Sequence, residues 1–153
     1  SLQVKAGAEV VQIFDSWASV LPAPQFERWC LAPVAQIAKA MKARHPEIKV
    51  IAFPRGVSPR HVGAVAHLEG INGVGLDTSA DVGACIAATP AHVALQGNLD
   101  PLLLLAGGPE LTREIHRIRD AFNGRPHIFN LGHGILPPTP IANVELLIRE
   151  VRS

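Results

Sequence analysis

Five short apolar segments alternate with stretches of helical periodicity along this chain, and this alternation constrains the fold more than any other feature. Strands are expected at residues 10–14, 49–53, 73–76, 92–95 and 127–131. Most of their residues are apolar without a two-residue alternation, which is typical of strands buried on both faces of a parallel sheet. Strands that alternate with helices indicate βαβ units, so the expected fold class is α/β with a parallel sheet. The first segment lacks a Gly-x-Gly-x-x-Gly fingerprint, which argues against a dinucleotide-binding fold.

The intervening segments predict helices with recognisable start and stop signals. Helices are expected over residues 26–41, 58–70, 79–88, 109–124 and 143–151, the last after a Thr139-Pro140 cap. Pro33 is expected to divide the first of them. Trp29 and Met41 fall on an apolar stripe of this helix and are predicted to pack in the core. The inward face of the 109–124 helix is predicted to consist of Leu111, Ile115, Ile118 and Phe122.

Composition excludes several classes of function. The chain has 153 residues, of which 48% are hydrophobic and 18% charged, as expected for one globular domain with a sizeable core. The net charge of +1 and the scattered basic residues predict no nucleic-acid partner. No apolar run has the length of a membrane span, so no membrane association is expected. Cys30 and Cys85 lack Cys-x-x-Cys spacing, which favours reduced thiols and a cytoplasmic location.

Polar residues gather just beyond the ends of the predicted strands. In a (β/α)8 barrel, the carboxyl ends of the strands form the face that carries the active site. Such a barrel needs eight strands and typically about 250 residues, whereas this sequence supplies five strands. We therefore expect residues 1–153 to be part of a single barrel domain, in a truncated or processed chain. The polar residues concerned are Asp15, Ser16, Arg55, Asp77, Gln96, Asn98 and His133.

His133 is the leading candidate for a functional side chain. It lies between Gly132 and Gly134, which add no bulk and allow a positive φ, so the imidazole is expected to project into a cleft. The alternative is a glycine-rich turn that carries an incidental histidine. Ser16 has no Gly-x-Ser-x-Gly elbow around it, so a hydrolase nucleophile is not supported. Its alternative role is a loop cap.

The remaining polar residues have structural alternatives as well. Asp15 and Asp77 are each expected to accept backbone N–H bonds, and Gln96 and Asn98 to bridge loops. Asp15, Asp77 and His133 together form a possible set of ligands for a divalent ion. No His-x-His, His-Glu-x-x-His or paired-cysteine spacing supports a metal site, so none is expected.

Three ordered motifs resemble the C-terminal half of the uroporphyrinogen decarboxylase family. They are Gln-Ile-Phe-Asp-Ser-Trp-Ala at 12–18, Ala-Leu-Gln-Gly-Asn-Leu-Asp-Pro at 94–101 and Phe-Asn-Leu-Gly-His-Gly-Ile at 129–135. Gly-Leu-Asp at 75–77 is a weaker fourth match, followed by Thr78 where the family often has tryptophan. The resemblance extends over nearly the whole chain. It implies the (β/α)8 barrel, of which this chain would supply about the last five βα units.

The resemblance also implies an activity. Family members remove the carboxyl groups of the four acetate side chains of uroporphyrinogen III, giving coproporphyrinogen III, in heme and porphyrin biosynthesis. They use no cofactor, because a protonated pyrrole ring accepts the electrons of the breaking C–C bond. Ser16 and His133 match family residues that contact substrate carboxylates, and Phe14 would be an apolar wall beside them. A homodimer is implied too.

The same resemblance implies that the site in this chain is incomplete. In the family, an aspartate, arginines and a tyrosine from the N-terminal half complete the site, and this sequence contains no tyrosine. The isolated chain is therefore expected to be inactive. The alternatives are a non-catalytic half-barrel and a related barrel methyltransferase.

Overall fold

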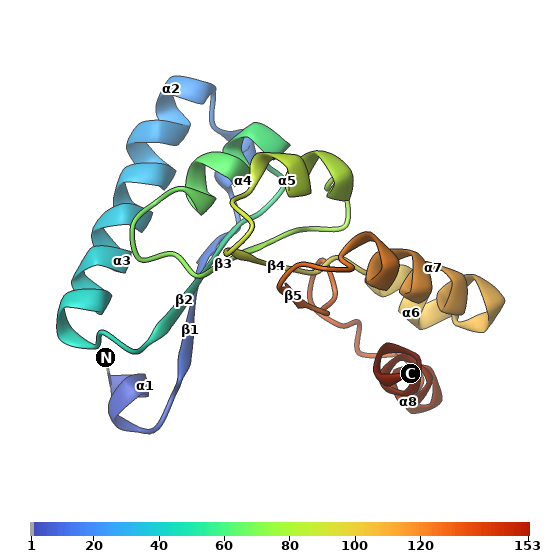
Figure 1. Ribbon diagram of the computed structural model, residues 1–153. Coiled ribbons are helices and arrows are strands. Elements are labelled where there is room, and N and C mark those ends of the chain that lie inside the picture. The colour runs from blue at the N-terminus through green and yellow to red at the C-terminus, as the bar shows by residue number, and fades with distance from the viewer. Residues whose placement is uncertain (1) are drawn as a thin grey trace.

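A computed structural model describes residues 2–153 and contains one sheet of five parallel strands (Figure 1). Each strand pairs with the one before it in the sequence, so the order along the sheet is the order along the chain. A doubly wound fold would reverse the strand order at a switch point, and this sheet does not. The α/β class with a parallel sheet is therefore confirmed. The strands are β1 (Val10–Asp15), β2 (Lys49–Pro54), β3 (Gly73–Gly75), β4 (Ala94–Gln96) and β5 (His127–Ile128).

Helical segments follow every strand and lie along the outside of the sheet (Figure 1). None of the helices within residues 2–153 is long and apolar enough to cross a membrane. After β1 come η1 (Ala18–Val20), α2 (Ala23–Phe26), the π-helical η2 (Glu27–Leu31) and α3 (Ala32–Arg44). The others are α1 (Leu2–Lys5), α4 (Pro59–Ala66), α5 (Val82–Ala88), α6 (Pro101–Ala106), α7 (Gly108–Ala121) and α8 (Ile141–Arg152).

Alternation along the strands divides the sheet into an outer face that packs on the helices and an inner face. On β2, Val50 and Ala52 belong to the main apolar core, whereas Ile51 is buried outside that cluster. Leu76 and Leu95 also join the helix-packed core. The inner face instead presents glycines, glutamines and phenylalanines: Gln12, Phe14, Phe53, Gly73, Gly75 and Gln96. It therefore has room for a cleft.

The prediction for α7 is confirmed, but the prediction for Trp29 is wrong. Leu111, Ile115 and Ile118 are completely buried against the core. Trp29 is 58% exposed, and its indole N–H donates to Gln25 Oε1 at 2.9 Å. The reason is the π-helical turn η2, whose wider hydrogen-bonding pattern interrupts the period of 3.6 residues on which the prediction depended.

Two predicted helix starts are also wrong, because the N-cap residues differ from those that the sequence suggested. Helix α5 begins at Val82 rather than at residue 79, since Asp81 Oδ1 accepts the Ala84 N–H at 3.0 Å. Helix α8 begins at Ile141 with Pro140 as its N-cap, and Thr139 makes no capping hydrogen bond. Other boundaries differ by a few residues. For example, β5 ends at Ile128 where the apolar pattern predicts residue 131.

His127 anchors β5 to the adjacent loop and to α7. Its ring stacks on Phe122 with the centroids 3.8 Å apart, and Nε2–H donates to the Gly97 carbonyl at 2.7 Å. Burial lowers the pKa of His127 below its ordinary value, because the charged imidazolium would lose its solvation. The folded chain therefore favours the neutral ring.

We expect the stability of the fold to decrease as the pH falls below about 6.5. In that range the unfolded chain binds a proton at His127 while the folded chain resists it, so protonation favours unfolding. His127→Gln, which cannot take up that proton, should flatten this part of the curve of unfolding free energy against pH. Urea unfolding between pH 5 and 8 measures it, with His92→Gln, an exposed site, as the control. Equal slopes for wild type and His127→Gln would contradict the assignment.

Candidate substrate cleft

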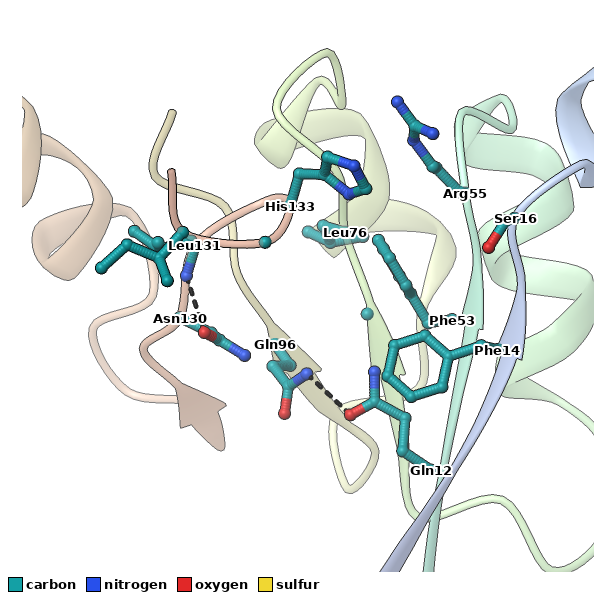
Figure 2. Close-up of a pocket in the computed structure, with 13 residues that line it drawn as sticks. Gln12, Phe14, Ser16, Phe53, Arg55, Leu76, Gln96, Asn130, Leu131 and His133 are labelled. Carbon is teal, nitrogen blue, oxygen red and sulfur yellow. Dashed lines mark hydrogen bonds between the residues drawn. The ribbon is translucent and has the colours of Figure 1, made fainter. Parts of the chain in front are cut away.

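A hollow of about 480 Å³ opens on the inner face of the sheet at the carboxyl ends of the strands (Figure 2). Ser16 and His133 both line it, as the sequence predicts, and Phe14 lies beside them. We call this site the inner-face hollow. Its full lining is Gln12, Phe14, Ser16, Phe53, Arg55, Gly75, Leu76, Gln96, Asn130, Leu131, His133, Gly134 and Ile135.

Two aromatic rings form the apolar wall of the inner-face hollow. Phe14 and Phe53 are paired neighbours on β1 and β2, and their rings meet edge to face with centroids 6.0 Å apart. Phe53 also covers Gly75, where an added Cβ would lie only 2.5 Å from the Phe53 ring. Glycine at this position therefore lets the aromatic wall lie close against the sheet.

Three polar side chains, Ser16, Arg55 and His133, stand around the opening and form what we call the rim (Figure 2). Ser16 and Arg55 come directly after the paired residues Asp15 and Pro54, so adjacent strands deliver them to the same level. None of the ion pairs formed among residues 2–153 uses Arg55. The rim thus offers a guanidinium, a hydroxyl and an imidazole, which together suit carboxylate groups.

The loop that carries His133 is held by the loop after β4 and lies against the loop after β3. The Gly132 N–H donates to the Leu99 carbonyl at 2.8 Å, and Asn98 Nδ2 donates to the Asp77 carbonyl at 3.0 Å. A Cβ on Gly132 would lie 2.4 Å from the backbone nitrogen of Thr78. Neither glycine beside His133 has a positive φ, so the expected left-handed conformation is not the reason for glycine here. The reason at 132 is close backbone contact.

Gly132→Ala should therefore displace the loop that carries His133, whereas Gly134→Ala should be tolerated. Overpacking against backbone that cannot move aside costs about 1–3 kcal/mol of folding free energy. An added Cβ on Gly134 meets nothing within 4 Å, which makes that variant a matched control on the other side of the histidine. Urea unfolding of the two variants provides the comparison, and equal stabilities would show that the loop is not held by Gly132.

Most of the other polar candidates have structural roles. Asp77 Oδ1 accepts the Ser79 N–H at 3.0 Å, and Asp15 Oδ1 accepts the Trp17 N–H at 3.3 Å, as the structural alternatives predict. Asn98 bridges loops as expected. Gln96 does not, because its amide N–H donates to Gln12 Oε1 on the inner face at 3.2 Å.

Neither a metal-binding cluster nor a reactive thiol is present in the described part of the chain. Asp15, Asp77 and His133 are not brought together, and residues 2–153 contain no group of three His, Cys, Asp or Glu side chains able to hold a metal ion. Burial, helped by Asp15, raises the pKa of Cys30 to about 12. Burial also raises the pKa of Cys85 to about 11, so both remain protonated thiols at neutral pH.

Sequence reasoning missed several residues that line the inner-face hollow, among them Gln12, Phe53 and Asn130. Gln12 and Phe53 could have been found from alternation. Gln12 is two residues before Phe14 on the same strand, and Phe53 is two residues before Arg55. Asn130 lies beyond the end of β5, where no strand period applies.

A sequential parallel sheet with a cleft at the carboxyl ends of its strands defines this chain as part of a (β/α)8 barrel protein. A methyltransferase from Methanosarcina mazei has a similar fold, with a TM-score of 0.78 over 97% of this chain and 43% of that one. The two are 23% identical, so this likeness concerns the fold alone. The family model "Uroporphyrinogen decarboxylase (URO-D)" matches residues 1–153, and the chain belongs to that family.

Curated relatives agree with the family assignment. The chain is 52% identical over 151 residues to uroporphyrinogen decarboxylase of Novosphingobium aromaticivorans, covering 99% of this chain and 44% of the relative. It is 51% identical over 153 residues to that of Granulibacter bethesdensis, covering 100% and 44%. The chain thus spans less than half the length of these relatives.

Proposed function

We propose that residues 1–153 form the last five βα units of a single (β/α)8 barrel domain that decarboxylates uroporphyrinogen III to coproporphyrinogen III without a cofactor. Family membership and the span of the relatives support this reading. In it, the protein is a cytoplasmic homodimer with neither nucleic-acid nor membrane partners. The observation that carries the proposal is the inner-face hollow, where a rim suited to carboxylates stands above an aromatic wall.

The roles of the residues follow from the chemistry of the substrate. Uroporphyrinogen carries carboxylate side chains around an apolar tetrapyrrole. Arg55, Ser16 and His133 at the rim would bind carboxylates by charge and hydrogen bonding. Phe14 and Phe53 would contact the pyrrole rings. The Phe14 ring is largely exposed, as expected for a side chain that a ligand or the remaining strands of the barrel would cover.

The test is to incubate the full-length protein that carries this chain with uroporphyrinogen III and separate the oxidised products by chromatography. We expect stepwise loss of carboxyl groups, ending at coproporphyrin. A wild-type protein that folds yet releases no carbon dioxide would overturn the proposal and favour the non-catalytic half-barrel. The methyltransferase alternative has no support beyond fold similarity.

Ser16→Ala in the same protein should lower kcat/KM for uroporphyrinogen III about 10- to 100-fold, because a hydrogen bond to a charged carboxylate contributes about 1.5–3 kcal/mol. Ser58→Ala is the matched control, because Ser58 is the N-cap of α4 and does not line the inner-face hollow. Initial rates at several substrate concentrations give both values. Equal losses in the two variants would show that Ser16 does not contact the substrate.

A further inference from the structure

A pair of glutamine side chains crosses the inner face of the sheet beneath the two phenylalanines (Figure 2). Gln12 comes from β1 and Gln96 from β4, so two strands lie between them, yet their amides are hydrogen-bonded at 3.2 Å. They can meet because β3 presents Gly73 and Gly75, which have no side chains, on this face. Gln96 is only 9% exposed. We call these two residues the amide pair.

The amide pair still has hydrogen-bonding capacity to offer a ligand. Gln96 uses one N–H as a donor and Gln12 uses its carbonyl as the acceptor. The NH2 of Gln12, the second N–H of Gln96 and the carbonyl of Gln96 are left, and both residues line the inner-face hollow. The floor of the hollow is therefore polar.

The part of the floor that this chain supplies is also uncharged. Gln12 is paired with Ile51, whereas Ser16 and Arg55 lie four residues further along the same two strands. At about 3.3 Å per residue, Gln12 is roughly 13 Å below the rim, whereas Gln96, paired with Gly75 at the level of Phe53, is roughly 7 Å below it. Arg55 is the only lysine or arginine, and no aspartate or glutamate occurs, among the described residues that line the hollow. Among the side chains of this chain, a ligand that reaches from rim to floor meets one cation at the top and neutral amides below.

We propose that the amide pair receives the acetate carboxylate that is about to leave, while the rim holds carboxylates that stay; this rests on the proposed function. A cation at the floor would stabilise the carboxylate before reaction, and so would raise the activation free energy for its loss as carbon dioxide. Neutral N–H groups position the carboxylate without that cost. The bond between the acetate methylene and its carboxylate breaks, and its electron pair enters the protonated pyrrole ring. Carbon dioxide leaves, the exocyclic carbon takes a proton from solvent, and the ring carbon releases the proton it had gained, which restores the aromatic pyrrole.

The decisive variant is Gln12→Lys, which places a cation at the floor. Uroporphyrin carries acetate carboxylates that coproporphyrin lacks, so the two oxidised porphyrins serve as binding probes. Quenching of tryptophan fluorescence in the full-length protein reports both affinities. We expect Gln12→Lys to bind uroporphyrin at least fivefold more tightly and coproporphyrin within about twofold of wild type. In turnover, its kcat should fall at least tenfold while KM stays level or falls.

Two controls distinguish a failure of this inference from a failure of the proposed function. Gln36→Lys adds the same charge on the exposed face of α3 and should change neither affinity. Equal changes for both porphyrins, or none, would overturn the role of the amide pair even if wild type is active. An inactive wild type would instead overturn the proposed function. Should Gln12→Lys fail to fold, Gln12→Leu decides, because loss of the amide should weaken uroporphyrin binding and leave coproporphyrin binding unchanged.

Discussion

His133→Asn in the full-length protein is expected to lower kcat/KM for uroporphyrinogen III about 10- to 100-fold, since a hydrogen bond to a charged group contributes about 1.5–3 kcal/mol. The imidazole is exposed at the rim, where Arg55 and Ser16 line the same opening. Asparagine is shorter than histidine, so a carboxylate held at the rim loses its hydrogen-bond partner. Kinetics of porphyrinogen turnover measure the loss.

The same variant should barely affect folding. His133 belongs to an exposed loop and packs in no part of the main core, so the thermal midpoint should stay within about 3 °C of wild type. His92→Asn, an exposed histidine outside the inner-face hollow, is the control for both measurements. A midpoint many degrees lower, with unchanged activity per folded molecule, would show that His133 is structural.

The 153-residue chain by itself is expected to be inactive and to associate with further copies of itself. Strand β1 pairs only with β2, and β5 pairs only with β4, so each leaves one edge of unpaired backbone groups. Such edges favour pairing with another chain. Apolar side chains on the two outer strands are also uncovered: Phe14 is 66% exposed, Val10 49% and Ile128 41%.

The energetic argument depends on these three residues. Ile13, Leu76 and Leu95 do not contribute to it, because they pack in or against the main core. Each large apolar side chain left in water forfeits about 1.5–3 kcal/mol, against a typical domain stability of about 5–15 kcal/mol. Sedimentation equilibrium should show mass that rises with concentration. A monomer at all concentrations with a cooperative melting transition would contradict this account.

Local patterns were enough to predict the five strands and the positions of Ser16 and His133 just beyond strand ends. Apolar runs fixed the five strands, and the barrel rule placed Ser16 and His133 at one end of the sheet. The motif resemblance added Phe14. Each of these inferences needs only residues that are close together in the sequence, which is why the structure agrees with them.

Features that depend on tertiary packing could not be predicted. The π-helical turn that exposes Trp29 has no simple sequence signal, and the hydrogen bond between Gln12 and Gln96 joins residues 84 positions apart. The need for glycine at 132 arises from the backbone of Thr78 on another loop. The two glycines beside His133 suggested a need for positive φ, whereas the structure shows that Gly132 is needed because a side chain would not fit.

The most direct test of the account is a crystal structure of the full-length protein with coproporphyrin bound. We predict that the tetrapyrrole lies in the inner-face hollow against Phe14 and Phe53. Its carboxylates should come within hydrogen-bonding distance of Ser16, Arg55 and His133. A porphyrin bound elsewhere, with the inner-face hollow filled by protein side chains, would contradict the central claim that this hollow is the substrate cleft.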